Sequence, residues 1–205
     1  MDKIKLSVII PVYNQEKLVI RALDSIPIRN DIEIIVIDDG STDNTWNHLL
    51  DYRKKNVIEK NIILLYNEHN KGVGYTVNKG YDNAHGEYIV LLGSDDYFTD
   101  NFNEYIDKLD GTDLIYFNLE DNTGKIWKIT PQNRNSYVGS VKFMRREFIG
   151  DTRCPEIRAL EDVSFHKGLM AKHPTEKFLN VVLKHYNFPR ENSLTDLVLK
   201  NKVQI

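Results

Sequence analysis

Residues 87–96, EYIVLLGSDD, are the stretch that decides the fold. The five residues from Tyr88 to Leu92 are apolar or prefer β-structure, which predicts a strand buried on both faces. Asp95 and Asp96 follow it directly. Ligands of open α/β sheets bind beyond the carboxyl ends of the strands, so two carboxylates here are placed to hold a hard cation that carries phosphate oxygens. A simpler interpretation is a polar turn that caps a helix beginning near Tyr97.

The composition is that of an ordinary globular chain. Its 205 residues are 41% hydrophobic and 28% charged, which is enough for one hydrophobic core. The net charge of -3 gives no general reason to bind nucleic acid. The single cysteine, Cys154, excludes an internal disulfide and a cysteine-rich zinc site. The N-terminus lacks a signal-peptide pattern, and no apolar run reaches about 18 residues. We therefore expect a cytoplasmic protein whose contact with a membrane is at most peripheral.

Strand-like and helix-like segments alternate along the first 100 residues. Near-continuous apolar runs predict buried strands, and segments with apolar residues on one face predict helices. The predicted strands are residues 6–11, 32–38, 62–66 and 88–92, and the predicted helices are 18–26, 46–52 and 75–84. Asn14 is expected to cap the first helix. This order predicts a parallel sheet with right-handed crossovers and helices on both faces.

Polar residues follow three of the predicted strands. They are the pairs at 13–14 (YN), 38–39 (DD) and 95–96 (DD). Each pair alone is explained by turn or cap chemistry, but the carboxyl ends of parallel strands meet at one rim, which favours a nucleotide or phosphate site. The chain has neither G-x-G-x-x-G after its first strand nor a Walker loop. Metal-assisted phosphate binding is the remaining simple option.

Three segments resemble the nucleotide-binding half of family 2 glycosyltransferases with the GT-A fold. They are residues 7–14 (SVIIPVYN), residues 33–45 (EIIVIDDGSTDNT) and residues 70–96, which contain AHGEYI and SDD. The resemblance implies an α/β GT-A fold with a mostly parallel central sheet, helices on both faces and a small antiparallel acceptor-side region. It further implies a single domain over 1–205, with a nucleotide-sugar-binding half (1–100), an acceptor and catalytic half (101–195) and a tail (196–205).

The resemblance also implies roles for particular residues. Asp96, with Asp95 beside it, is expected to hold Mn²⁺ or Mg²⁺ against the diphosphate. The donor nucleotide-sugar is expected to contact Pro11, Tyr13, Asn14, Asp39, Lys71, Gly72, Asp95 and Arg190. In the segment EDVSFH, Asp162 is expected to be the general base and Glu161 to orient the acceptor. Taken alone, two acids at the start of a helix are more simply explained by the helix dipole.

The second half of the chain is less regular. We predict helices at 102–109 and 141–148, a strand at 113–118 and a hairpin at 121–129. Trp127 in that hairpin either stacks on a sugar or packs at an edge. Near the end of the chain, Arg190 is the first candidate to contact the leaving diphosphate, and His185 and Lys184 are weaker candidates. A charge that is only solvated beside a strand explains Arg190 equally well.

The predicted activity is transfer of a sugar from a UDP-sugar to the hydroxyl of a glycan, a polymer or another acceptor, with inversion and metal assistance. Two positions depart from the family pattern: Gly93 stands where many members have an aspartate, and Val77 where many have an arginine. These departures favour one alternative, a nucleotide-sugar-binding protein with weak or lost transfer. A nucleotidyltransferase is a third reading, but its usual basic glycine-rich loop is not visible. A homo-oligomer is compatible with the sequence.

Overall fold

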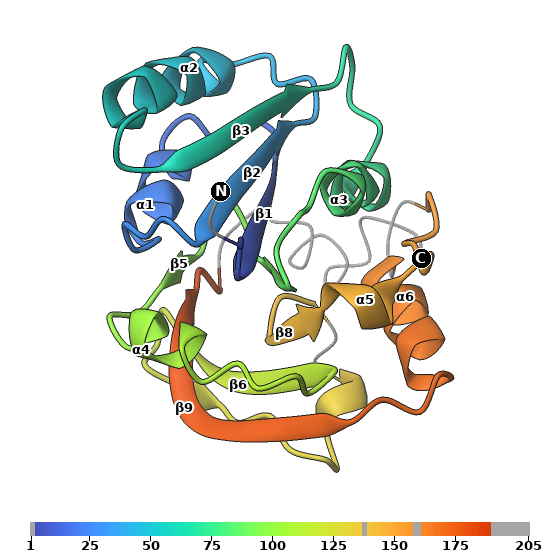
Figure 1. The fold of residues 1–205 in the computed structure, drawn as a ribbon. Coiled ribbons are helices and arrows are strands. Elements are labelled where there is room, and N and C mark those ends of the chain that lie inside the picture. The colour runs from blue at the N-terminus through green and yellow to red at the C-terminus, as the bar shows by residue number, and fades with distance from the viewer. Residues whose placement is uncertain (1–2, 137–138, 158–160, 190–205) are drawn as a thin grey trace.

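The computed structural model describes residues 3–136, 139–157 and 161–189, which form one mixed sheet with helices on both faces (Figure 1). Its strands are β1 (Leu6–Val12), β2 (Ile32–Asp38), β3 (Asn61–Tyr66), β4 (Tyr88–Leu91), β5 (Tyr97–Phe98), β6 (Leu114–Asp121), β7 (Ile126–Trp127), β8 (Lys142–Arg145) and β9 (Glu176–Tyr186). Its helices are α1 (Val19–Asp24), α2 (Thr45–Asn56), α3 (Val73–Asp82), α4 (Phe102–Ile106), α5 (Arg146–Ile149) and α6 (Glu161–Met170), with a 3₁₀ turn η1 (Arg134–Ser136).

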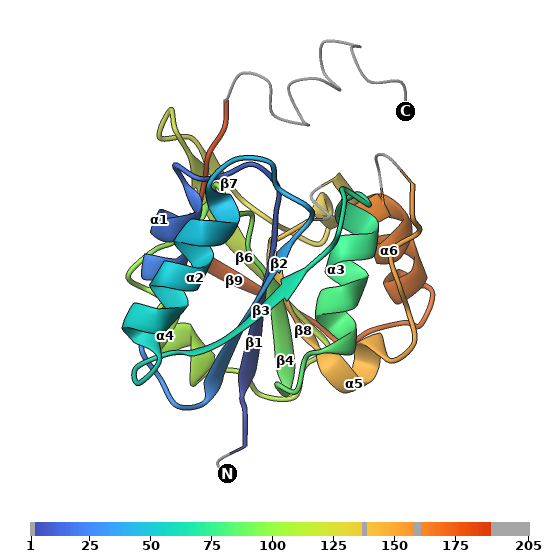
Figure 2. The ribbon, with the colours of Figure 1, turned by 90° about the horizontal axis from the view of Figure 1, so that it is seen from above.

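The N-terminal half of the sheet is parallel, in the order β3-β2-β1-β4. Every residue of β2 is buried, and in β1 only Pro11 is not. Side chains of successive strand residues point to opposite faces, so β1 contributes Val8 and Ile10 to one core and Ile9 to the other. The first core also holds residues of α1, α2 and α4, and the second holds residues of α3 and α6. Figure 2 shows these two helix layers with the sheet between them.

The C-terminal half of the sheet contains the antiparallel pairings. β8 lies between β4 and β6 and is antiparallel to both, whereas β6 and β9 are parallel. The short β5 closes the sheet against β9, and β7 returns antiparallel to β6. The predicted fold class, a mostly parallel α/β sheet with an antiparallel region, is confirmed.

The helix predicted at residues 141–148 is wrong. The structure places β8 at Lys142–Arg145 and only a short helix, α5, after it. Within β8, Phe143 enters the first core and Met144 the second, as in a strand buried on both faces. The apolar spacing of this segment fits a helix as well, but β4 and β6 each need a hydrogen-bonding partner, and β8 supplies it to both.

Two local predictions also need correction. Asn14 does not cap α1, which begins at Val19 with Leu18 at the N-cap and no side-chain cap bond. Instead, Asn14 has a positive φ of 51° and its Oδ1 accepts a hydrogen bond from Thr42 N at 2.8 Å. The acidic turn is followed by β5 rather than by a helix at Tyr97. α4 ends at Ile106, earlier than predicted.

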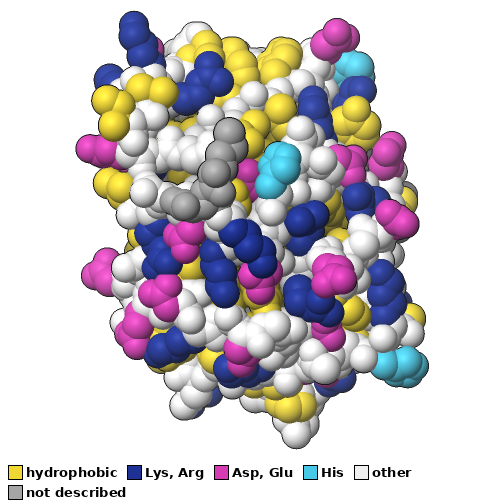
Figure 3. All heavy atoms as spheres, in the orientation of Figure 1, with side chains coloured by type: hydrophobic (Ala, Val, Ile, Leu, Met, Phe, Trp, Pro, Cys, Tyr) yellow, Lys and Arg dark blue, Asp and Glu magenta, His cyan; other side chains and the backbone are white. Residues whose placement is uncertain are grey.

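The molecular surface carries mixed charges. On the face shown in Figure 3, basic and acidic side chains of the described residues are interspersed rather than gathered by sign. This agrees with the small net charge of -3. No helix among the described residues is long and apolar enough to cross a membrane.

Candidate active site

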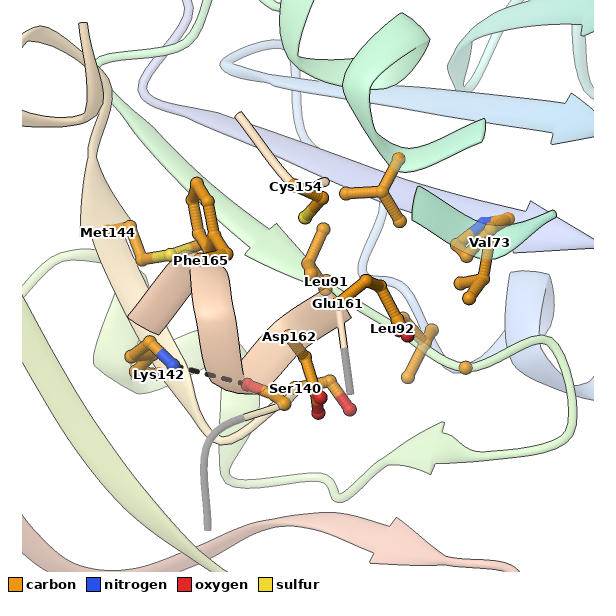
Figure 4. Close-up of a pocket in the computed structure, with 14 residues that line it drawn as sticks. Val73, Leu91, Leu92, Ser140, Lys142, Met144, Cys154, Glu161, Asp162 and Phe165 are labelled. Atoms are coloured by element: carbon orange, nitrogen blue, oxygen red, sulfur yellow. Dashed lines mark hydrogen bonds between the residues drawn. The ribbon is translucent and has the colours of Figure 1, made fainter. Parts of the chain in front are cut away.

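A cavity of about 170 Å³ lies where the sheet meets α3 and α6 (Figure 4). The carboxyl-end side of the sheet contributes Pro11 and Gly93, and α3 contributes Val77. Glu161 and Asp162, the first two residues of α6, line the same cavity. Pockets for whole drug-sized ligands begin at roughly 300 Å³, so this cavity fits only part of such a ligand.

The two acids of α6 therefore share one cavity with Pro11 and Gly93. Burial raises the pKa of Glu161, with a smaller contribution from the neighbouring Asp162 carboxylate. Asp162 Oδ1 accepts a hydrogen bond from Val163 N at 2.8 Å. A Cβ added at Gly139 would lie 3.3 Å from Asp162 Oδ2, so the chain before β8 passes close to this carboxylate.

Asp39 fastens the loop that precedes α3. Its Oδ1 accepts from Asn67 Nδ2 and from Lys71 N, both at 2.9 Å, and its Oδ2 accepts from Gly72 N at 2.9 Å. Gly72 has a φ of 90°, a left-handed conformation that glycine adopts without the steric cost of a Cβ. These bonds bring Lys71 and Gly72 beside the end of β2. Asp39 therefore holds the loop between β3 and α3 at the end of β2.

The ends of β1 and β2 are joined by polar contacts. Asn14 N donates to Ser41 Oγ at 2.9 Å, and Ser41 N donates to Asp38 Oδ1 at 2.7 Å. Burial raises the pKa of Asp38, and the hydrogen bonds from Ser41 lower it by a smaller amount. Tyr13 is 42% exposed, so its ring is accessible at this rim for stacking on a planar group.

Asp96 is buried and held by contacts with the protein. It is only 3% exposed, its Oδ2 accepts from Lys184 Nζ at 2.9 Å, and its Oδ1 accepts from Asn187 N at 2.9 Å. Lys184 Nζ also donates to Ser140 Oγ. Both oxygens of Asp96 thus hold the end of β9 against the acidic turn.

Asp95 is partly exposed, and its backbone oxygen accepts a hydrogen bond from Arg21 Nη2 at 2.6 Å. A Cβ added at Gly93 would lie 2.9 Å from Asp96 Oδ2 and 3.1 Å from Asp95 Oδ1. The carboxylates of Asp95 and Asp96 therefore occupy the space beside Gly93. No group of three or more His, Cys, Asp or Glu able to hold a metal occurs among the described residues.

The remaining predicted site residues divide between structural contacts and undescribed positions. Lys184 is held by Asp96, and His185 stacks on Tyr97 with ring centroids 4.6 Å apart. Trp127 donates its Nε1 hydrogen to Asp121 Oδ2 at 2.8 Å. Arg190 lies outside the described residues.

Sequence reasoning missed Lys142. Its side chain is 2% exposed and lines the cavity near Asp162. The predicted helix at 141–148 gave no reason to place it in the site, because a helix and a strand direct this side chain differently. The strand pairing of β8 is the signal that locates it.

The comparisons with known proteins agree with this geometry. Residues 7–167 match the family model described as glycosyl transferase family 2. The chain belongs to glycosyl transferase family 2. The family match includes the rim of the sheet, the cavity and the two acids of α6.

Three individual proteins illustrate the likeness. A poly(ribitol-phosphate) beta-glucosyltransferase of Bacillus spizizenii is 39% identical over 97 residues, which is 45% of this chain and 15% of that protein. The S. aureus TarS 1-349 structure in complex with UDP-GlcNAc superposes with a TM-score of 0.77 at 24% identity, over 92% of this chain and 60% of that one. The mannosyltransferase PcManGT from Pyrobaculum calidifontis, solved with GDP-Man and Mn²⁺, gives 0.71 at 18% identity, over 92% and 58%. These structural matches establish the GT-A fold.

Proposed function

We propose that the chain transfers a sugar from a UDP-sugar to an acceptor hydroxyl with inversion, and that Asp162 is the general base. One observation carries the proposal: Asp162 and Glu161 line the same cavity as Pro11 and Gly93 at the carboxyl-end side of the sheet. The family supplies the reaction class. TarS, a structural relative, was solved with UDP-GlcNAc, which supports uridine in the donor.

The proposed reaction is a single displacement at the anomeric carbon. Asp162 removes the proton from the acceptor hydroxyl, whose oxygen forms a bond to the anomeric carbon. The bond from that carbon to the diphosphate oxygen breaks, and the electron pair leaves with UDP. Attack opposite the leaving group inverts the configuration, so an α-linked donor gives a β-linked product. Glu161, whose pKa burial raises, is suited to hold the acceptor through a hydrogen bond.

The donor is proposed to lie along the rim of the sheet. Tyr13 supplies an exposed ring for the base, and Pro11 lines the same edge. The loop that Asp39 fastens presents Lys71 and the start of α3, where backbone N–H groups favour an anion. Arg190 is proposed to add charge near the diphosphate.

The rim of the sheet gives a divalent cation few protein ligands. Asp95 is one carboxylate near the rim, and Mg²⁺ or Mn²⁺ commonly binds through one or two carboxylates together with phosphate oxygens and water. We therefore propose Asp95, rather than Asp96, as the protein ligand. When bound, the ion would supply positive charge to the departing diphosphate.

The acceptor is proposed to be a hydroxyl of a glycan or polymer. The Bacillus spizizenii relative is named as a poly(ribitol-phosphate) beta-glucosyltransferase, which supports a polymeric hydroxyl acceptor.

UDP release from a panel of UDP-sugars with Mn²⁺, with and without acceptors, tests the proposal. We expect Asp162→Asn to lower turnover by roughly 10² to 10⁴-fold, the range that general base catalysis contributes. Asp100→Asn, an exposed aspartate after β5, is the matched control and should leave turnover unchanged. Unchanged turnover in Asp162→Asn would refute the assignment of Asp162 as the general base.

Gly93 and Val77 favour a second candidate, a nucleotide-sugar-binding protein without transfer. Val77 is 4% exposed and lines the cavity, so the positive charge found at this place in many members is absent from its wall. Under this candidate, UDP-sugars raise the melting temperature, but neither hydrolysis nor transfer occurs with any donor or acceptor.

A further inference from the structure

One row of residues along α3 holds a segment of the chain that precedes α6. Gly74, Asn78 and Asp82 are four residues apart, so they lie on one face of the helix. Asn78 uses both ends of its amide: Nδ2 donates to Cys154 O, and Cys154 N donates to Oδ1, each at 2.8 Å. Arg153 donates from Nε and Nη2 to Asp82 Oδ1, at 3.0 and 2.7 Å. The row therefore binds two consecutive residues of that segment.

The third member of the row, Gly74, lies beside the first acid of α6. A Cβ added at Gly74 would lie 2.6 Å from Pro155 O and 3.4 Å from Glu161 Cβ. A glycine at this position lets the backbone of residue 155 approach α3 this closely. Residues 153–155 thus meet the row in reverse order, from the C-terminal end of α3 to its N-terminal end, where Glu161 lies.

The same segment also packs against α6. A Cβ added at Gly168 of α6 would lie 3.2 Å from Thr152 Cγ2. The two helices lie side by side (Figure 2), and the ring of Tyr81 of α3 stacks on Phe165 of α6 with centroids 5.2 Å apart. Cys154 is 6% exposed and lines the cavity together with the two acids of α6 (Figure 4). A shift of residue 154 would therefore move both a wall of the cavity and the support of α6.

We propose that Asn78 is a positioning residue for the two acids of α6. Its amide fixes residue 154, and the packing of residues 152–155 against α3 and α6 holds Glu161 and Asp162 in the cavity. This inference rests on the proposed function, because it assumes that Asp162 is the base. Reacting groups that are displaced by about 1 Å lose roughly 100-fold in rate. The donor is proposed to lie along the rim of the sheet, so loss of the amide lowers kcat and leaves UDP binding intact.

Asn78→Leu tests this role, because leucine has a similar size and makes neither hydrogen bond. We expect kcat for UDP release, from the UDP-sugar that the wild type turns over fastest, to fall roughly 10- to 100-fold. The Kd for UDP, measured by calorimetry with Mn²⁺, should change less than about twofold. The stoichiometry of UDP binding should stay at the wild-type value, which shows that the loss of rate is not a loss of folded protein. Asn83→Leu is the matched control, because Asn83 donates to Lys79 O of its own helix, and it should change neither quantity.

Two further variants address the same contact in other ways. A protonated aspartate, like asparagine, carries one donor and one acceptor, whereas the ionised form cannot donate to Cys154 O. The kcat of Asn78→Asp, relative to that of the wild type at the same pH, should therefore rise as the pH falls from about 8 to 5. Gly74→Ala keeps both hydrogen bonds of Asn78 but forces Pro155 O away from α3. It should likewise lower kcat and leave UDP binding unchanged.

The outcomes separate the two proposals. A wild type that releases no UDP from any donor contradicts the proposed function itself. An active wild type together with unchanged kcat in Asn78→Leu overturns only the role of Asn78. A loss of kcat matched by an equal loss of UDP-binding stoichiometry shows that the amide only stabilises the fold, and also overturns it. If Asn78→Leu does not fold, wild-type kcat in Gly74→Ala and a relative kcat of Asn78→Asp that does not vary with pH overturn it instead.

Discussion

The buried pair between Asp96 and Lys184 gives the sharpest test of how the acidic turn is built. The two side chains are 4% and 2% exposed, and the oxygen and nitrogen are 2.9 Å apart. Asp96→Asn keeps the shape of the side chain but leaves the ammonium without its counter-charge. Breaking a buried pair in this way costs roughly 3 to 5 kcal/mol. Because the amide oxygen and Ser140 Oγ still accept hydrogen bonds, we expect the lower end, about 3 kcal/mol.

Urea unfolding followed by circular dichroism measures this loss. The double variant Asp96→Asn with Lys184→Met removes both charges, and we expect it to recover stability to within about 1 kcal/mol of the wild type. The exposed pair of Lys177 and Asp110, 41% and 47% exposed, is the matched control. Asp110→Asn should cost less than about 1 kcal/mol.

The same variant decides between a structural and a metal-binding Asp96. Mn²⁺-dependent binding of UDP, measured by calorimetry, should weaken more in Asp95→Asn than in Asp96→Asn under conditions where both are folded. An Asp96→Asn protein with wild-type stability and lost Mn²⁺ dependence would refute the assignment of Asp96 to the ion pair.

Two further predictions concern packing and pH. In a urea titration, Gly80→Ala should destabilise the fold by about 1 kcal/mol, because the new Cβ would lie 2.5 Å from Ile9 Cγ2. Overpacking costs roughly 1 to 3 kcal/mol, which exceeds the gain of about 1 kcal/mol in helix propensity. Gly168→Ala, whose Cβ would lie 3.2 Å from Thr152 Cγ2, should cost less in the same titration. His166 has its pKa lowered from 6.5 to about 4, so the unfolded chain binds its proton first as pH falls, and stability should drop between pH 6.5 and 4 by as much as about 3 kcal/mol. His166→Gln should flatten that part of the stability profile, and an unchanged slope would contradict the burial of a neutral imidazole.

The sequence by itself determined the parallel half of the sheet. Strands buried on both faces must be apolar throughout, so β1, β2 and β4 were visible as continuous runs. The carboxyl ends of parallel strands share one edge, so the polar residues after these runs predicted where the rim would lie. The acids of α6 were placed by resemblance to the family, since their spacing alone also fits a helix start.

The tertiary structure decided which buried charged side chains lie in contact. Residues 141–148 satisfy both a helical and a strand pattern, and only the unpaired edges of β4 and β6 select the strand. That choice places Lys142 in the lining of the cavity that Asp162 also lines. Asp96 meets Lys184, which is 88 positions away in the chain, because β9 returns beside the acidic turn. Local sequence reports periodicity and turn chemistry, whereas the partner of a buried charge is fixed by strand pairing between distant segments, and no local pattern encodes that pairing.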